Sequence, residues 1–308
     1  MANVLRFLRA TDRNPVVILI RKLFSIILRK ILFFDWLLSS NRSQIDPVST
    51  RIDLTSIFMF VHYSKTNQID QFDRNVLLEM RQLGFTVILV TNSSNDCDEL
   101  ADIVLKKGKF GRDFASLRDV VRMIPINSRE IVEVLYMNSS MIWKKRSLAT
   151  LLNLLRRFPI NEVVVPTISL NPVQHAQPFF VYTRLDFPHQ VHYQKSFDWI
   201  KNVRFKRSAV IFSEYRFFTT LTDYGWKVSP VANYWELVRV ENQIRKNMNE
   251  LPLSEKNTLY NPTQHFWRCL PHFGIFAIKR TLVEKNPVCV RNPPVGVLAA
   301  SKYLEMLG

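Results

Sequence analysis

Apolar positions in the chain follow two patterns that alternate between residues 55 and 170. Short, continuously apolar runs have the pattern of buried parallel strands, and they occupy residues 56–62, 85–90, 103–105, 131–137 and 162–168. Apolar residues at helical spacing fill the segments between them, at 67–83, 113–124 and 147–158. Strands that alternate with helices predict βαβ units. We therefore expect an α/β fold with a mostly parallel sheet flanked by helices.

Polar residues follow several of these predicted strands. In such sheets, ligands bind beyond the carboxyl ends of the strands. The candidate ligand-binding positions are His62, Thr91, the loop 106–113, Asn138, Ser139, Ser140 and residues 167–169.

Residues 16–38 predict a long helix with two different sides. The pairs Arg21-Lys22 and Arg29-Lys30 interrupt the apolar run, so a transmembrane helix is not expected. An apolar face beside basic pairs is typical of a helix that lies in the plane of an anionic membrane surface. A helix packed on the core or in an oligomer, and a targeting or anchor segment, are the alternatives. Residues 39–50 are polar and predict a linker, which divides the chain into 1–50 and 51–308.

The net charge of +16 calls for a polyanionic partner: nucleic acid, an acidic membrane face or a phosphorylated substrate. No dense basic run or known reading module points to nucleic acid. The three cysteines, Cys97, Cys269 and Cys289, have no CxxC spacing. This pattern predicts buried free thiols and a reducing compartment. Together these features predict a peripheral protein on the cytoplasmic face of a membrane.

A basic loop precedes the predicted helix at 113–124. Lys106, Lys107, Lys109 and Arg112 surround two glycines, and Asp113 stands near the helix start. Backbone N–H groups at a helix start favour a diphosphate, and arginine can bind phosphate with two parallel hydrogen bonds. The alternative is an ordinary solvated loop.

Three later segments carry further candidate side chains. His175 and Gln177 are two apart on an extended segment, where a hydroxyl-rich acceptor or a phosphate would suit both. Ser213 is expected to cap a helix that runs to Gly225, and it places Glu214 at the start. A carboxylate there can take the proton of an attacking hydroxyl, or it can simply stabilise the helix dipole.

An asparagine-proline turn forms the last of these segments. Residues 261–267 read NPTQHFW and contain His265 and Trp267. Aromatic side chains of this kind stack on sugar rings, or they pin the C-terminal segment to the core.

Taken in order, these motifs resemble the rhamnan synthesis protein F family of glycosyltransferases. The matching pieces are 111–114 (GRDF), Asn138-Ser139-Ser140, 175–180, Ser213-Glu214 with 223–226, 261–267, and 278–280 with 286–287. The resemblance covers residues 55–290. It implies a GT-A-like nucleotide-binding fold and transfer of a sugar, often rhamnose, from a nucleotide sugar to a lipid-linked or cell-surface polysaccharide. It also implies that Asn138–Ser140 hold the donor and that Glu214 is the base of an inverting reaction.

The chain departs from the family pattern at one position. The family commonly has Asn-Asp-Ser where this chain has Asn138-Ser139-Ser140. The missing acid is the residue that would bind Mg²⁺ or Mn²⁺ on the donor diphosphate, so the sequence leaves the metal unassigned. It also motivates an alternative function, a catalytically inactive glycan-binding or scaffold subunit of a polysaccharide-synthesis complex.

Overall fold

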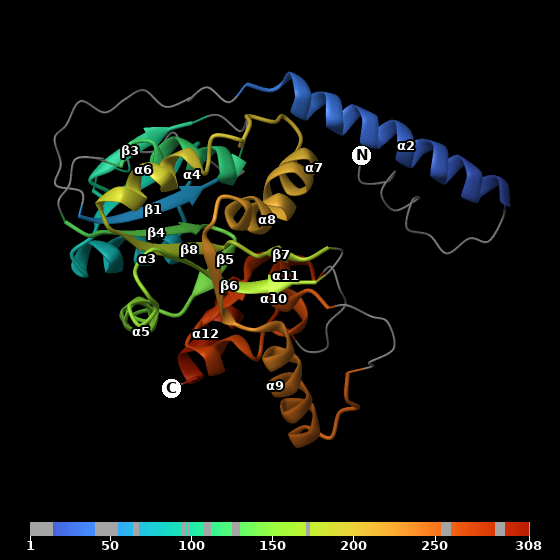
Figure 1. The fold of residues 1–308 in the computed structure, drawn as a ribbon. Coiled ribbons are helices and arrows are strands. Elements are labelled where there is room, and N and C mark those ends of the chain that lie inside the picture. The colour runs from blue at the N-terminus through green and yellow to red at the C-terminus, as the bar shows by residue number, and fades with distance from the viewer. Residues whose placement is uncertain are drawn as a thin grey trace.

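A mixed sheet forms the centre of the protein, with helices on both of its faces (Figure 1). The computed structural model describes residues 15–40, 55–63, 68–93, 97, 99–107, 112–124, 130–170, 173–253, 260–286 and 293–307. Within these ranges the sheet has eight strands, seven of them in the order β3-β2-β1-β4-β8-β6-β7, with β9 paired to β6.

The strands at one side of the sheet are parallel. They are β1 (Ser56–His62), β2 (Thr86–Thr91), β3 (Ile103–Lys106) and β4 (Val132–Asn138). β1 lies between β2 and β4, and β3 pairs with β2. The strands are largely buried because helices cover both faces, which explains their continuous apolar runs.

The other side of the sheet is mixed. Its strands are β6 (Glu162–Ser169), β7 (His175–Ala176), β8 (Phe180–Leu185) and β9 (Lys227–Ala232). β8 runs antiparallel to both β4 and β6, so β6 runs in the same direction as β4. β9 is parallel to β6. A separate small sheet pairs β5 (Met141–Trp143) with β10 (Ala277–Lys279) in antiparallel fashion.

Helices sandwich the large sheet. One face is covered by α4 (Arg112–Val121), α6 (Phe187–Lys195) and α8 (Tyr215–Asp223). The other is covered by α3 (Gln71–Gln82), α5 (Leu148–Leu155) and α9 (Tyr234–Asn247). An apolar cluster fills each face: the first lies under α4, α6 and α8, and the second lies under α3, α5 and α9. Successive side chains of a strand point to opposite faces, so Met59 contributes to the first cluster and Phe60 to the second.

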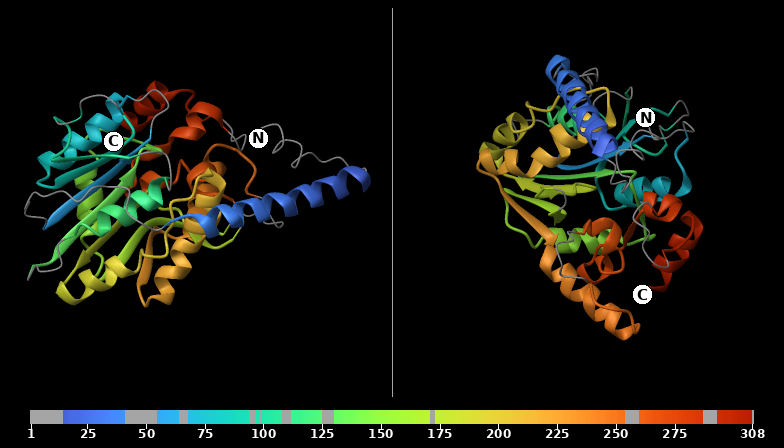
Figure 2. Two further views of the ribbon diagram at one scale, coloured as in Figure 1. Left: turned by 90° about the horizontal axis from the view of Figure 1, so that it is seen from above. Right: turned by 90° about the vertical axis from the view of Figure 1, so that its right-hand side faces the viewer.

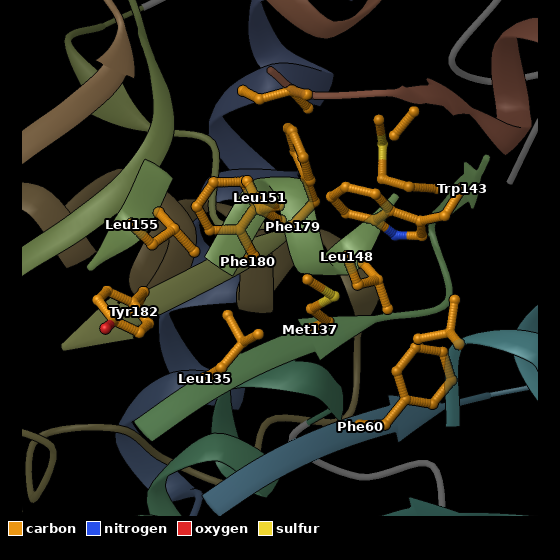
Figure 3. Packing of buried hydrophobic residues seen from close by; sticks show 14 of the residues in the cluster. Phe60, Leu135, Met137, Trp143, Leu148, Leu151, Leu155, Phe179, Phe180 and Tyr182 are labelled. Carbon is orange, nitrogen blue, oxygen red and sulfur yellow. The ribbon is translucent and has the colours of Figure 1, made fainter. Parts of the chain in front are cut away.

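The second cluster contains much of the aromatic core (Figure 3). There Leu135 and Met137 of β4 lie beside Phe180 of β8, and Leu148 and Leu151 of α5 pack over them. The layered result is a GT-A-like α/β fold, a mostly parallel sheet flanked by helices with an amphipathic helix at its N-terminal side, as the sequence predicted.

A third apolar cluster holds the C-terminal helices to the β5–β10 sheet. These helices are α10 (Pro262–His265), the 3₁₀ turn η2 (Leu270–Phe273), α11 (Arg280–Lys285) and α12 (Val297–Met306). Gly274 ends η2 with φ of 76°, a left-handed conformation that glycine adopts without strain.

Cys97 and Cys269 are buried free thiols, as predicted, and Cys289 lies outside the described residues.

The helix that carries Glu214 begins earlier than predicted. α7 (Lys206–Ala209), the π-helical turn η1 (Val210–Glu214) and α8 follow one another without a break. The prediction that Ser213 is an N-cap is therefore wrong, because Ser213 is buried inside a continuous helical segment. Single π-helical turns of this kind occur frequently at functional sites.

α2 (Pro15–Leu38) extends away from the body of the protein (Figures 1 and 2). Its C-terminal end contacts α7. Among the described residues, no helix is long and apolar enough to cross a membrane. Residues 41–54, which include most of the predicted linker, lie outside the described residues.

A fully buried guanidinium ties α4 to the segment after α6. Arg118 donates from Nε and Nη2 to Asp119 Oδ1 at 2.8 and 2.5 Å and from Nη1 to the carbonyl of Ile200 at 2.5 Å. Nη2 also donates to Asn202 Oδ1 at 3.1 Å. Lys107 donates to the other oxygen of Asp119 at 2.8 Å. Buried charges such as these are sustained only while their partners remain in place.

We predict that Arg118→Ala strongly destabilises the fold. The change removes the guanidinium from buried acceptors and should lower the free energy of unfolding by about 3 kcal/mol or more. Urea denaturation measures this loss. The control is Arg122→Ala in the turn directly after the same helix, where the partly exposed pair with Asp198 should contribute at most about 1 kcal/mol. Equal effects of the two substitutions would contradict the assignment.

Candidate active site

The candidate site lies where parallel strands of the sheet end. The carboxyl ends of β1, β2, β3 and β4 meet at one edge because these strands run in the same direction. Parts of the loops that follow them, at 64–67, 94–96 and 108–111, lie outside the described residues. The described residues at this edge nevertheless form a specific cluster.

Asn138 at the end of β4 approaches Asp113 at the start of α4. Its Nδ2 donates to Asp113 Oδ2 at 3.3 Å. Tyr136 precedes Asn138 by two residues and therefore shares its side of the strand. Burial raises the pKa of the Tyr136 hydroxyl well above 10, and the charges of Asp113 and Glu214 raise it further. The end of β4 thus presents an amide and a phenol beside one carboxylate.

The turn after β4 is held by Arg280. Ser140 donates from N and Oγ to Asn138 Oδ1 at 3.1 and 2.5 Å. Arg280 donates from Nε to the carbonyl of Ser139 at 3.1 Å and from its backbone N to that of Ser140 at 2.8 Å. The oxygen of Asn138 is thereby committed to the turn, while Nδ2 faces Asp113.

Glu214 reaches the same site from the π-helical turn η1. Burial raises the pKa of its carboxyl above 4.5, although the charges of Lys279 and Lys206 act in the opposite direction. Glu214 is also near enough to Tyr136 for its charge to raise the pKa of that hydroxyl. A carboxylate whose pKa is raised is a stronger proton acceptor than one with the usual pKa.

Lys279 is the last residue of β10, and its charge and that of Glu214 act on each other. Burial lowers the pKa of the Lys279 ammonium, and the charge of Glu214 raises it. Its Nζ donates to Thr263 Oγ1 at 3.3 Å. We use "strand-end cluster" for five residues that are connected here by a hydrogen bond or by the effect of their charges on one another: Asp113, Tyr136, Asn138, Glu214 and Lys279.

His175 and Gln177 lie beside this cluster and are both buried. The ring of His175 is 4.7 Å from that of Tyr215, the residue after Glu214, and its Nδ1 is 2.8 Å from the carbonyl of Val173. Burial lowers the pKa of His175, and the charge of Lys279 lowers it further. Gln177 instead accepts from the backbone N of Thr263 at 3.2 Å, so it anchors the 261–265 turn.

His62 and Thr91 point to the opposite side of the sheet from the strand-end cluster. His62 Nδ1 lies 3.2 Å from Thr91 Oγ1, and its Nε2 lies 3.6 Å from Asp73 of α3. Burial lowers the pKa of His62 to about 4, so the ring is neutral at neutral pH. Because side chains alternate along β1, its neighbour Tyr63 faces the cluster and contacts Ser116 of α4 at 2.9 Å.

The basic loop is not the free set of four cations that the sequence predicted. Lys107 is buried against Asp119, and Lys106 donates to the carbonyl of Ser93 at 2.9 Å. Burial lowers the pKa of Lys107 to about 8. Lys109 lies outside the described residues, as does the side chain of Arg112.

The last two sequence candidates have structural contacts. Trp267 is only 2% exposed and packs in the third apolar cluster, with its ring 5.1 Å from that of Tyr303. It therefore pins the C-terminal helices, the second of the two roles considered for it. His265 Nδ1 lies 3.0 Å from the backbone N of Asn261, and its ring is 5.2 Å from that of Tyr260.

Sequence reasoning gave no role to Tyr136 or Lys279. Tyr136 lies within an apolar run and reads as core, although its two-residue spacing from Asn138 places both on one side of β4. Lys279 directly precedes the partly buried Arg280, and the end of β10, which pairs with β5, brings its charge within range of Glu214.

A divalent metal does not fit the described residues of this site well. Within the described ranges, no three His, Cys, Asp or Glu side chains gather as a metal-binding group. Asp113 is the carboxylate beside Asn138, whose oxygen is already held by the turn. Mg²⁺ and Mn²⁺ prefer several oxygen ligands, so we derive no step through a metal.

Comparisons with known proteins add little to this description. No protein-family model matches the chain, and no curated protein matches it. Among solved structures it is similar to the bifunctional IspDF from Campylobacter jejuni, with a TM-score of 0.34 and 11% sequence identity. The match covers 56% of this chain and 48%, about half, of that one. A likeness this distant supports no argument about function.

We predict that Glu214→Gln lowers the pKa of Lys279. The substitution removes the charge that raises this pKa and leaves the burial that lowers it. NMR titration of ¹³Cε-labelled lysine measures the shift, and Lys279→Arg assigns the resonance. The exposed Glu236→Gln is the control and should leave the titration unchanged. An unchanged midpoint in Glu214→Gln would contradict the pairing.

Proposed function

We propose that this chain is a glycosyltransferase that moves a sugar, with rhamnose the first candidate, from a nucleotide-sugar donor to a growing lipid-linked or cell-surface polysaccharide. The ordered motifs that resemble the rhamnan synthesis protein F family support this proposal. The GT-A-like α/β fold is compatible with nucleotide binding. We assign the reaction to the inverting class.

The observation that carries the proposal is the convergence of Glu214 with the end of β4. These segments lie far apart in the sequence, yet the charge of Glu214 acts on Tyr136, two residues before Asn138. A donor held beyond the carboxyl ends of the strands would lie next to a carboxylate whose pKa is raised. This is the arrangement that direct displacement requires.

In the proposed step, the oxygen of an acceptor hydroxyl bonds to the anomeric carbon of the donor. The bond from that carbon to the diphosphate oxygen breaks, and its electron pair leaves with the nucleoside diphosphate. Glu214 takes the proton of the hydroxyl. Attack from the side opposite the leaving group inverts the configuration.

Lys279 and Asn138 assist the reaction through charge and position. The ammonium of Lys279 stabilises the carboxylate form of Glu214, which must be present before the proton moves. The amide nitrogen Nδ2 of Asn138 supplies an N–H group where the nucleotide sugar would bind. Such fixed groups are effective because they need little reorganisation during the reaction.

The second candidate function is an inactive glycan-binding or scaffold subunit. It is favoured by the residue at position 139, where this chain has a serine and the family carries an acid. The carbonyl of Ser139 accepts a hydrogen bond from Arg280 and so has a structural role in the turn. This candidate predicts sugar binding without turnover.

We predict that Glu214→Gln lowers turnover by about 10²–10⁴-fold while donor affinity changes little, because the amide cannot accept the proton. Release of nucleoside diphosphate in the presence of acceptor measures turnover, and Glu236→Gln is the matched exposed control. The acidic limb of kcat/KM in the unchanged protein should lie above pH 4.5, since the pKa of Glu214 is raised. Full turnover by Glu214→Gln would overturn the assigned mechanism.

We also predict that one nucleotide sugar raises the melting temperature of the protein with or without added Mg²⁺. At 100 times its Kd, a ligand stabilises the folded state by about 2.7 kcal/mol. A thermal-shift panel of nucleotide sugars measures the effect. Stabilisation without any turnover of the same donor would favour the inactive subunit, and stabilisation by none of them would contradict both candidates.

A further inference from the structure

We propose that α2 and the exposed basic segment 204–207 form one surface, the docking face, which binds an anionic lipid bilayer and fixes the Glu214 turn relative to it. The part concerning Glu214 rests on the proposed function. The binding of lipid does not.

α2 turns an apolar face away from the rest of the protein. At about 100° per residue, Leu23, Ile27 and Phe34 lie opposite Leu32 and Trp36. Leu32 is buried at 3% exposure, whereas Leu23, Ile27 and Phe34 are 53%, 54% and 54% exposed. The views in Figures 1 and 2 show most of this helix standing clear of the body. A helix that exposes so much apolar surface requires a covering partner.

The C-terminal end of α2 is firmly seated on the segment that leads to Glu214. Trp36 stacks on Phe212 of η1, with ring centroids 5.5 Å apart, and Lys201 lies 4.3 Å from the Trp36 ring. The carboxylate of Asp35 accepts from the backbone N–H groups of residues 204–205 at 3.1 and 3.2 Å. The helix therefore attaches to the chain two residues before the candidate base.

Positive charge surrounds this apolar surface. Lys22, Arg29 and Lys30 are exposed along α2, and residues 204–207 (RFKR) form an exposed basic segment beside its end. Asp35, the one acidic residue of α2, already binds the backbone of 204–205. Cations beside an apolar helix face match an anionic bilayer, where each contributes favourably near the surface.

A second copy of the chain fits this surface less well. Two docking faces would bring their exposed cations together, and each chain carries a net charge of +16. Like charges across an interface oppose association. The charge pattern therefore selects an anionic lipid surface as the occupant.

A groove beside the end of α2 combines the same two chemistries. Phe34 and Leu38 line it from α2, and Arg204 and Phe205 line it from the facing segment. Polar residues also line the groove, and among them the carboxylate of Asp35 is already bound to the backbone of 204–205. The apolar side chains and the guanidinium of Arg204 suit a lipid chain below a phosphate headgroup. The groove places lipid contact directly at the joint between α2 and the Glu214-bearing helix.

This geometry relates the bilayer to the candidate site. Lys206 belongs to the exposed basic segment, and its charge also acts on Glu214. The docking face and the proton acceptor are therefore on neighbouring parts of one helical segment. A bilayer bound there brings membrane-borne acceptors close to Glu214, which agrees with a lipid-linked acceptor.

Co-sedimentation with vesicles, without donor or acceptor, tests the binding. We expect the full chain to bind phosphatidylcholine vesicles containing phosphatidylglycerol at least tenfold more tightly than phosphatidylcholine alone, and salt should weaken binding. Two variants should each lose about tenfold or more: Ile27→Asp with Phe34→Asp, and Arg204→Gln with Lys206→Gln and Arg207→Gln.

Matched control variants change the same kinds of residue at positions away from the docking face. Leu298→Asp alters an exposed apolar residue of α12, and Lys145→Gln, Lys285→Gln and Lys302→Gln together remove three exposed cations elsewhere. Both controls should bind as the unchanged chain does. Equal binding to both vesicle types, or equal losses in variants and controls, would overturn the proposal. So would a dimer that the Ile27→Asp, Phe34→Asp variant converts to monomer, since a second copy would then cover the face.

Hydrogen exchange tests the connection to Glu214. Anionic vesicles should slow exchange of the backbone amides of 206–214 in the unchanged chain. They should not do so in Trp36→Ala, which loses the stack on Phe212. Protection in both would show that α2 is not coupled to this turn. Loss of vesicle binding would refute the docking face and leave the glycosyltransferase proposal standing. Vesicle binding without any sugar transfer would support the docking face and contradict the glycosyltransferase proposal.

Discussion

The guanidinium of Arg280 joins three segments that the rest of the site depends on. It binds Asp70 and Asp73 at the start of α3, at 2.5 and 3.1 Å, and the carbonyl of Ser139 in the turn after β4. Its backbone continues directly from Lys279 at the end of β10, and the charges of Lys279 and Glu214 act on each other. A partly buried arginine with several acceptors holds such a junction more rigidly than a single pair does. The turn, α3 and the cation of the site are therefore fixed together.

Burial explains why the residues near Glu214 have unusual acidity. The carboxyl of Glu214 and the ammonium of Lys279 each lose hydration, which moves their pKa values toward each other, and each partly restores the charged form of the other. Charged groups that lose hydration cost stability compared with apolar groups in the same place. Their presence beside the π-helical turn η1 is consistent with a role in chemistry.

Patterns along the sequence predicted the fold well because they record burial directly. The apolar run at 56–62 coincides with β1, and the predicted strands at 85–90 and 131–137 are displaced by only one residue at each end. β8 escaped prediction, since its run FVYTRL mixes polar and apolar residues. The helix start at Ser213 was misplaced because helical backbone already begins at Lys206 and continues through Ser213, which is buried inside it.

The sequence by itself determined the α/β class, the positions of the parallel strands, the amphipathic character of α2, and Glu214 and Asn138 as candidates. These depend on local periodicity and on residue chemistry. Only the tertiary structure decided that His62 faces α3, that Lys107 is buried against Asp119 and that the charges of Lys279 and Glu214 act on each other. Those outcomes depend on which strand faces which helix and on pairing between β5 and β10, contacts between residues distant in the chain that no local pattern encodes.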